Sequence, residues 1–323
     1  MRHLVLGGGG FIGSHLVRRL VREGHDVTFV DVRFPYYRTK LWEGATPCKG
    51  DLRDPQVVQN VMGMQAHAWD MVWQLAADMG GVEYFHGDFD WIAAVNNQLI
   101  NTQVMKYSID YGVKRVLFTS TACALATQQQ SHNIHRPLAE HDLNWGTPDQ
   151  LYGQEKRNSA IMWSTVFMDS RVVFLHTVYG PFQEYSGIRM KFPMAVAQKA
   201  RKARETGVIE LLGDGRQVRT FMYIKDAIDR LMAVGQAENV TSMYNIGGVT
   251  SFTCDEVAEI AGWHAVDDPD RCSPYEIRHI PGPTGVEHRT CSMARFEEDF
   301  PGYKYRTLDW GMRKMIKWLD END

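Results

Sequence analysis

The sequence lacks any close pairing of cysteines. Its five cysteines are scattered, and no two of them stand in a CxxC spacing; they are Cys48, Cys123, Cys254, Cys272 and Cys291. An odd number without such spacing argues against zinc ligands, a redox pair or a disulfide framework. We therefore expect no bound metal, and we expect the reducing cytoplasm as the location. A chain of 323 residues buries enough apolar surface to fold without such cross-links.

The sequence also has no long hydrophobic run and little excess charge. Met1-Arg2-His3 leads directly into a short apolar stretch and then into glycines. We therefore expect neither a signal peptide nor a membrane span, which needs about 20 apolar residues. The formal net charge is only −4, so neither nucleic acid nor an anionic membrane is expected as a partner.

What the sequence does contain is an alternation of short apolar runs with helical patterns. The expected strands are Leu4–Leu6, Val27–Val30, Met71–Leu75, Val116–Ser120 and Arg171–Leu175, and the expected helices are about Ile12–Glu23, Gln98–Tyr111, Tyr152–Phe167 and Trp310–Leu319. This alternation is typical of βαβ units. It predicts an α/β fold, a Rossmann-type doubly wound parallel sheet with helices on both faces.

The pattern loosens beyond Tyr179-Gly180-Pro181. Turn signals follow at Gly213-Asp214-Gly215 and at Pro281-Gly282-Pro283. We expect here a smaller C-terminal α/β lobe that is interleaved with the end of the sheet domain. The expected division assigns 1–178 plus about 220–250 to the sheet domain, and 179–219 plus about 251–323 to the lobe.

A glycine-rich turn follows the first expected strand. It supplies Gly7, Gly10 and Gly13, with Phe11 and Ile12 between the last two. Glycines allow a tight turn, a close approach of the backbone to a pyrophosphate and close packing of helix on strand, while the helix N-terminus attracts the phosphates. The segment indicates a dinucleotide site, although glycines also serve turns that bind nothing.

Two acidic residues strengthen the prediction of a dinucleotide site. Asp31 ends the second expected strand, 18 residues after Gly13, where a carboxylate can accept both ribose hydroxyls of NAD and repel the extra phosphate of NADP. Arg33 weakens the argument against NADP. Asp51 follows a further short strand that is expected to end just before Gly50. It is a candidate to bind the adenine amino group, with Leu52 packed against the adenine ring. The alternative for Asp51 is a helix cap, a role that Asp54 can also fill.

A tyrosine and a lysine stand four residues apart at Tyr152 and Lys156, and thus on the same helical face. A phenol is a poor base at neutral pH, but a nearby ammonium and a positive nicotinamide favour the phenolate. Tyr152 is then able to take a proton from a substrate hydroxyl. A surface Tyr-Lys pair is the alternative. The pair follows the hydroxyl-rich strand end Thr119-Ser120-Thr121 by about thirty residues.

Together these motifs resemble the extended short-chain dehydrogenases, the family of sugar-nucleotide epimerases and dehydratases, along nearly the whole chain. The matching pieces are Gly7 to Gly13, Asp31, Asp51-Leu52, Leu75-Ala76-Ala77, Asn97, Thr121, Tyr152 with Lys156, and Tyr179-Gly180-Pro181. The resemblance implies NAD as cofactor, held by the pieces from Gly7 to Asn97 together with Thr119, Tyr152 and Lys156, and a nucleotide-diphosphate sugar as substrate. It also implies that Thr121 helps bind the substrate alcohol, and that the helices near Gln98–Tyr111 and Tyr152–Phe167 form a homodimer interface.

Longer strings resemble the GDP-mannose 3,5-epimerases of this family. They are Leu75 to Gly81, Thr121-Ala122-Cys123, Gly213-Asp214-Gly215 with Gln217 and Arg219, and His279 to Pro283 with Gly285-Val286. The resemblance implies transient oxidation at C4 of a GDP-hexose, which acidifies the protons at C3 and C5. It makes Cys123 an acid/base and lets Arg219 and Arg289 hold the diphosphate. It implies further substrate contacts at Met79, Gly80, Gly81, Arg189, Lys191 and Gln217.

The sequence departs from this pattern at two places. Ser186 stands where these epimerases carry a second acid/base, a lysine, so Lys191, Arg189 or His176 must substitute if epimerisation occurs. Ala124-Leu125-Ala126 replaces the usual aromatic and proline. A C4 oxidoreductase or a 4-epimerase, which need only Tyr152, Lys156 and Thr121, therefore stays open as the alternative. A 4,6-dehydratase is disfavoured because Ala122-Cys123 replaces the Asp-Glu pair that such enzymes carry. The non-enzymatic alternative is a scaffold that senses a nucleotide.

Overall fold

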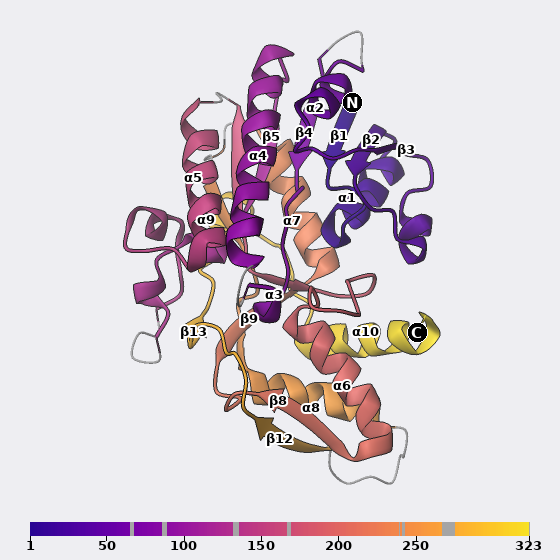
Figure 1. Cartoon of the computed structure of the whole chain (residues 1–323), viewed down its shortest axis with the longest axis vertical. Coiled ribbons are helices and arrows are strands. Elements are labelled where there is room, and N and C mark those ends of the chain that lie inside the picture. Colours follow the sequence, from indigo (N-terminus) through magenta and orange to yellow (C-terminus); the bar gives the residue numbers. More distant parts are fainter. Residues whose placement is uncertain are drawn as a thin grey trace.

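The computed structural model describes residues 1–64, 68–85, 89–131, 136–166, 169–238, 240, 243–266 and 275–322; Cys272 and the expected helix end at Phe167 lie outside them. Its centre is a seven-stranded sheet in the order β10-β6-β5-β4-β1-β2-β3 (Figure 1). All neighbouring strands in it run parallel. The strands are β1 (Arg2–Leu6), β2 (Asp26–Asp31), β3 (Thr46–Lys49), β4 (Met71–Gln74), β5 (Val116–Thr121), β6 (Ser170–Leu175) and β10 (Met243–Ile246).

Both faces of this sheet are covered because successive residues of a strand point to opposite sides. Val5 belongs to the same core as Leu16 of helix α1, whereas Leu4 belongs to the other core, with Val104 of α4. Burying one such side chain contributes about 1.5–3 kcal/mol. The helices of the sheet domain are α1 (Phe11–Arg22), α2 (Pro55–Met62), α4 (Phe89–Asp110), α5 (Gln150–Val166) and α7 (Ile224–Gln236). The expected Rossmann-type α/β fold is confirmed.

A smaller set of elements lies below the sheet domain in Figure 1. Strand β9 is paired with β7, β11 and β13, and β8 is paired with β12. The elements of this region are β7 (Thr177–Tyr179), α6 (Phe192–Thr206), β8 (Val208–Leu212), β9 (Val218–Tyr223), β11 (Ser251–Thr253), α8 (Cys254–Ala265), β12 (Glu276–Ile280), β13 (His288–Arg289) and α10 (Leu308–Asn322). Helix α9 (Ala294–Asp299) packs near β10.

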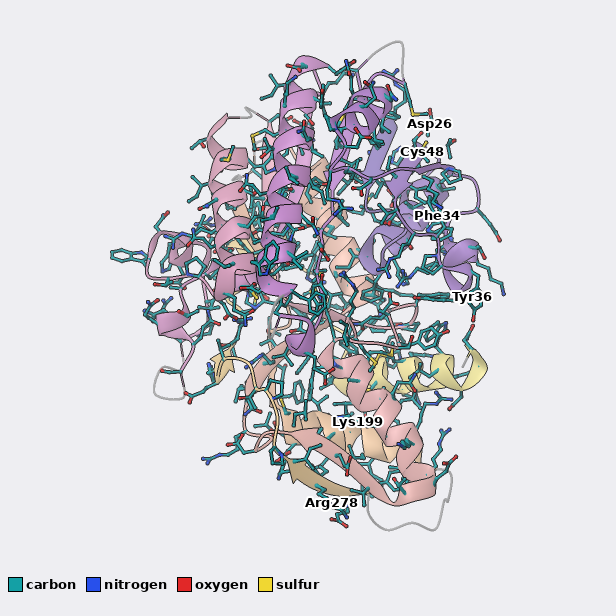
Figure 2. The ribbon with its side chains drawn as sticks, viewed as in Figure 1. Asp26, Phe34, Tyr36, Cys48, Lys199 and Arg278 are labelled. Carbon is teal, nitrogen blue, oxygen red and sulfur yellow. The ribbon has the colours of Figure 1, made fainter. Side chains whose placement is uncertain are left out.

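Short helical turns fill the connections. They are η1 (Tyr36–Leu41), α3 (Val82–Phe85), η2 (Ala122–Ala124), η3 (Thr127–Gln129) and η4 (Glu140–Asn144). Tyr36 of η1 is 75% exposed and projects from the outer side of the molecule (Figure 2). Within the described ranges, no helix is long and apolar enough to cross a membrane.

The largest departure from the expected elements is the start of α4. The sequence places it near Gln98, whereas the helix begins at Phe89. The early turns show no clear apolar stripe, because Ala93 is buried while Trp91 and Val95 on the opposite side are at least half exposed. A one-sided pattern is the main sequence signal for a helix, so these turns escape it.

Candidate active site

The residues that the sequence singles out meet in one cleft of about 1130 Å³. It lies where β1, β2, β4 and β5 end, beside the point where the strand order reverses between β1 and β4. This edge of an open α/β sheet is the general place for ligands. Of the expected site residues, Asn97 is the exception, because it is fully buried behind the cleft. Its side chain accepts from the amide of Asp78 at 2.7 Å and donates to the carbonyl of Asp78 at 2.9 Å.

The glycine loop fits a dinucleotide pyrophosphate. Gly7 has a φ of +83°, and a Cβ there would lie 2.7 Å from the amide nitrogen of Ala76. A Cβ on Gly13 would lie 2.1 Å from the carbonyl oxygen of Gly7. The N-cap of α1 is Gly10, which has no side chain to compete for the first helical amides, and Phe11 and Ile12 line the cleft beside it. Small residues here leave room for phosphates at the helix N-terminus.

The end of β2 carries the expected ribose ligand. Burial raises the pKa of Asp31, while the amides of Arg33, Val32 and Gly9 oppose that rise. Farther along, the carboxylate of Asp51 is held by the Arg53 side chain at 2.5–3.0 Å. Adenine recognition by Asp51 therefore stays a prediction. Asp54 does cap α2, by accepting from the amide of Gln56 at 2.9 Å.

Tyr152 lies at the start of α5 and is 5% exposed. Asp90 of α4 fixes its backbone, accepting from the Tyr152 amide at 3.0 Å and the Leu151 amide at 2.9 Å. The Tyr152 ring stacks on the Phe85 ring with a centroid distance of 4.6 Å. Burial raises the pKa of Tyr152 far above its ordinary value, and the charges of Cys123 and Glu155 act in the same direction.

Two residues with expected catalytic roles lie near Tyr152, and those roles stay predictions. Thr121 hydrogen-bonds with the Tyr152 side chain and opposes the rise of the Tyr152 pKa. Lys156 is 2% exposed, and its Nζ lies 5.1 Å from the centre of the Phe118 ring. Burial lowers the pKa of Lys156. In the protein alone both groups are thus pushed toward their neutral forms, and a cation entering the cleft would favour the phenolate. The hydroxyl of the expected cofactor ligand Thr119 donates to the carbonyl of Gln74 at 3.2 Å.

Cys123 accepts a hydrogen bond from Arg289, an arginine far away in the sequence. Arg289 donates to Cys123 Sγ at 3.1 Å and to the Asp149 carboxylate at 2.5 Å. Burial alone would lower the pKa of Arg289, but Cys123 and Asp149 outweigh it and the pKa is raised. A persistent cationic donor on sulfur stabilises negative charge there. The acid/base role that the resemblance implies for Cys123 stays a prediction.

Of the three candidates to replace the missing lysine, Lys191 is best placed. Burial lowers the pKa of Lys191 to about 8, and the nearby Cys123 opposes that fall. Burial and the Arg289 charge lower the pKa of His176 to about 3, so His176 is uncharged at neutral pH. Arg189 is engaged by the Asp78 carboxylate at 2.7 Å and the Met79 carbonyl at 2.8 Å. Ser186 is exposed and lies outside the described lining of the cleft.

The lobe side of the cleft is electropositive. Burial and the charge of Arg289 lower the pKa of Arg219 to about 10. Neighbouring guanidinium groups are suited to an anion such as a diphosphate, and that role of Arg219 and Arg289 stays a prediction. Gln217 lines the same end, although its amide donates to Asp214 at 2.7 Å. Gly81 also belongs to the lining: a Cβ there would lie 2.3 Å from the carbonyl of Met190.

The structure adds cleft residues that the sequence does not reveal. Among them are Arg38, Phe85, Asp149, Gln183, Glu184, Lys199 and Cys254. Lys199 reaches the cleft from α6 in the lower part of the molecule (Figure 2). Asp149 stands three residues before Tyr152 without belonging to a motif, and the others are far from Tyr152 in the sequence, so local patterns carry no signal for them. In the described part of the chain, no three His, Cys, Asp or Glu side chains gather as metal ligands.

Comparison with known proteins agrees with this geometry. The NAD dependent epimerase/dehydratase family matches residues 3–247. GDP-mannose 3,5-epimerase 1 of Oryza sativa subsp. indica is 31% identical over 326 residues, which covers 99% of this chain and 82% of that relative. The UDP-N-acetyl-alpha-D-glucosaminuronate decarboxylase of Bacillus cytotoxicus is 26% identical, over 99% of this chain and 98% of that relative.

A solved structure confirms the fold independently. The UDP-glucose 4-epimerase of Thermus thermophilus in complex with NAD has a TM-score of 0.81 at 22% identity, over 100% of both chains. The resemblance read from the glycine loop and from Tyr152 and Lys156 is thereby confirmed. Because the family match spans most of the chain and includes the cleft, the chain belongs to the NAD-dependent epimerase/dehydratase family and is an enzyme of extended short-chain dehydrogenase fold.

Proposed function

We propose that this enzyme epimerises a GDP-hexose at C3, C5 or both through transient oxidation at C4, in the manner of the GDP-mannose 3,5-epimerases. The observation that carries the proposal is the pair formed by Cys123 and Lys191. Both line the cleft that holds Tyr152, and Cys123 lies close enough to Lys191 to oppose the fall in its pKa that burial causes. Chemistry at C4 alone has no use for a second acid/base pair, whereas inversion at carbon needs one group to remove a proton and another to return it.

The first part of the proposal concerns C4. NAD, when bound along Gly7–Gly13 and Asp31, supplies the hydride acceptor and later returns the hydride. Tyr152 accepts the proton of the C4 hydroxyl, and Thr121 orients that hydroxyl through its bond with Tyr152. Lys156, one turn along α5, holds the nicotinamide ribose. Because burial of Tyr152 disfavours the phenolate, its formation depends on the positive nicotinamide.

The second part concerns the carbons next to the ketone. Cys123 removes the activated proton, and the Arg289 guanidinium donates a hydrogen bond to its sulfur at 3.1 Å. Lys191 returns a proton from its ammonium group, since a group of pKa about 8 is protonated at neutral pH and still releases its proton readily. Arg219 and Arg289 hold the diphosphate, whose charge relieves their mutual repulsion. Met79, Gly80 and Gly81 shape the sugar side of the cleft.

The test is turnover of GDP-mannose in heavy water. The proposal predicts deuterium at C3 or C5 of the recovered sugar nucleotide and a sugar of inverted configuration. A C4 oxidoreductase or a 4-epimerase is the second candidate, and the position of Ser186 outside the described cleft lining favours it. That candidate predicts no deuterium at C3 or C5. An oxidoreductase would also change the NADH absorbance in proportion to substrate, whereas a scaffold would show neither signal.

Three further features belong to the proposal. A homodimer through α4 and α5 is supported by the large apolar side chains that these packed helices expose, which are Trp91, Val95, Leu99, Leu151, Ile161 and Met162. Sedimentation of the purified enzyme measures its oligomeric state.

A cytoplasmic location is supported by the free thiols of Cys48, Cys123, Cys254 and Cys291. The division into 1–178 plus about 220–250 for NAD, and 179–219 plus about 251–323 for the nucleotide sugar, is retained as part of the same proposal.

A further inference from the structure

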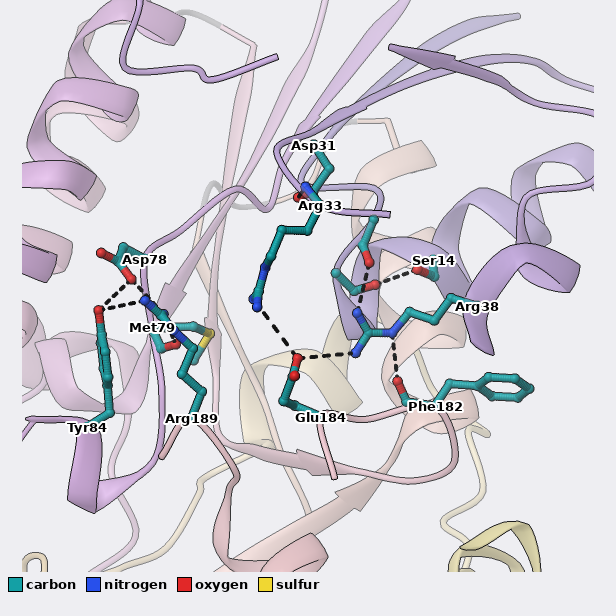
Figure 3. Close-up of polar contacts among 12 residues, drawn as sticks. Ser14, Asp31, Arg33, Arg38, Asp78, Met79, Tyr84, Phe182, Glu184 and Arg189 are labelled. Carbon is teal, nitrogen blue, oxygen red and sulfur yellow. Dashed lines mark hydrogen bonds and ion pairs between the residues drawn. The ribbon is translucent and has the colours of Figure 1, made fainter. Parts of the chain in front are cut away.

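Residues 181–189, here called the strap, run between β7 and α6 and are attached on both sides of the cleft. At one end Arg38 donates to the carbonyl of Phe182 at 2.8 Å and to the carbonyl of Gly9 at 2.9 Å (Figure 3). At the other end Arg189 donates to Asp78 and to the carbonyl of Met79. The strap therefore connects the glycine loop with the loop that follows β4.

The first residues of the strap have a fixed conformation. Phe182 has a φ of +68°, in the left-handed region that bulky residues rarely adopt. Such a backbone persists only where the surroundings impose it. The Phe182 ring packs against His15 of α1 and Trp318 of α10, with centroid distances of 5.7 and 5.3 Å, and Arg38 holds its carbonyl. The backbone that leads into the next residue, Gln183, is therefore held by contacts of Phe182 with η1, α1 and α10.

Gln183 is 2% exposed and lines the cleft. Among the described residues, neither its amide nitrogen nor its amide oxygen has a hydrogen-bond partner. Burying an amide without partners is costly, and buried polar groups in folded proteins are nearly always satisfied. A fixed, buried carboxamide that faces a ligand cleft without partners indicates that the ligand supplies them.

We propose that Gln183 is a further dinucleotide-binding residue, whose Nε2 donates to a pyrophosphate oxygen of NAD and whose Oε1 accepts from a ribose hydroxyl. A dinucleotide offers the acceptors and donors that this carboxamide lacks. The link from Phe182 through Arg38 to Gly9 puts the start of the strap at the glycine loop, where the phosphates of NAD are expected. A nucleotide sugar carries the same diphosphate and ribose chemistry, so binding must be measured for both ligands.

The test compares Gln183→Met, which removes both polar atoms at similar length, with Gln183→Glu, which replaces the donor with a carboxylate. Gln236→Met, at the exposed end of α7, is the control. NADH and GDP affinities are measured by fluorescence titration of protein stripped of cofactor, and the Tm of the same stripped protein is recorded. None of these measurements needs turnover, so failure of the proposed epimerisation would not affect them.

We expect Gln183→Met to weaken NADH binding about tenfold, equivalent to 1.4 kcal/mol, and Gln183→Glu to weaken it further. GDP affinity should change less than twofold. The Tm of stripped Gln183→Met should equal or exceed that of the parent, because the variant removes buried polar atoms without partners. NADH affinity within twofold of the parent, a larger loss for GDP than for NADH, or failure of both variants to fold would each overturn the proposal.

Discussion

Replacement of Lys191 by methionine or arginine tests the proposed chemistry most directly. Burial brings the pKa of Lys191 to about 8, so the ammonium group is a good proton donor below that pH. A positioned general acid contributes about 10²- to 10⁴-fold to a rate. We expect both variants to lose formation of the inverted sugar by that factor, whereas deuterium exchange without inversion persists because Cys123 still removes the proton. Arginine keeps the positive charge but does not release its proton, so the charge alone should not rescue inversion.

The pH dependence gives a second measurement on the same residue. Because the acid must be protonated, product formation by the parent enzyme should fall about tenfold per pH unit above pH 8. This limb should be absent from the residual activity of Lys191→Arg. Lys202→Met, an exposed position on the same helix α6, is the matched control and should form the inverted sugar at the parent rate. Formation of the inverted sugar within threefold of the parent in either Lys191 variant would refute the assignment.

Three other changes test separate parts of the site. Tyr152→Phe should abolish turnover while NAD affinity stays within a few-fold, as measured by titration; a near-normal rate would remove Tyr152 from catalysis. Cys123→Ala should stop exchange at the sugar carbons but spare partial oxidation at C4, seen as NADH absorbance; unchanged exchange would make Cys123 structural. Asp31 predicts that the enzyme binds NAD more tightly than NADP. Glu184→Gln should reduce that preference several-fold by freeing Arg33, whose guanidinium lies 4.0 Å from the Glu184 carboxylate (Figure 3). Equal ratios of NADH to NADPH affinity in parent and variant would contradict this role of Glu184.

Much of this structure is predictable because its signals are local. The runs that become β1, β4 and β5 are apolar on both faces, and the glycine loop follows directly after the first of them. Tyr152 and Lys156 stand one turn apart on a single helix, so a spacing of four residues identifies them. These features depend only on neighbours within a few positions, which is the range over which periodicity and turn chemistry operate.

The partners of the sugar-side acid/base are not local. Cys123 meets Arg289, which is 166 residues away, and Arg289 meets Asp149 at a separation of 140. No periodicity connects such positions, and only the resemblance to known epimerases pointed to Arg289. Alignment by resemblance also has a limit here, because it led to Ser186, an exposed residue. The lysine whose pKa responds to Cys123 is Lys191, five positions later, at the N-cap of α6.

The charges in the cleft indicate an order of events. With no ligand, burial favours neutral Tyr152 and neutral Lys156, and Arg219 and Arg289 repel each other. A bound dinucleotide with a cationic nicotinamide favours the phenolate, and a bound diphosphate relieves the arginines. Under the proposed function, Tyr152 therefore reaches its phenolate form only when the cationic nicotinamide is present. Because Arg289 contacts Cys123 and is proposed to hold the diphosphate, we expect binding of the substrate anion and the reactivity of the thiol to be coupled through one guanidinium group.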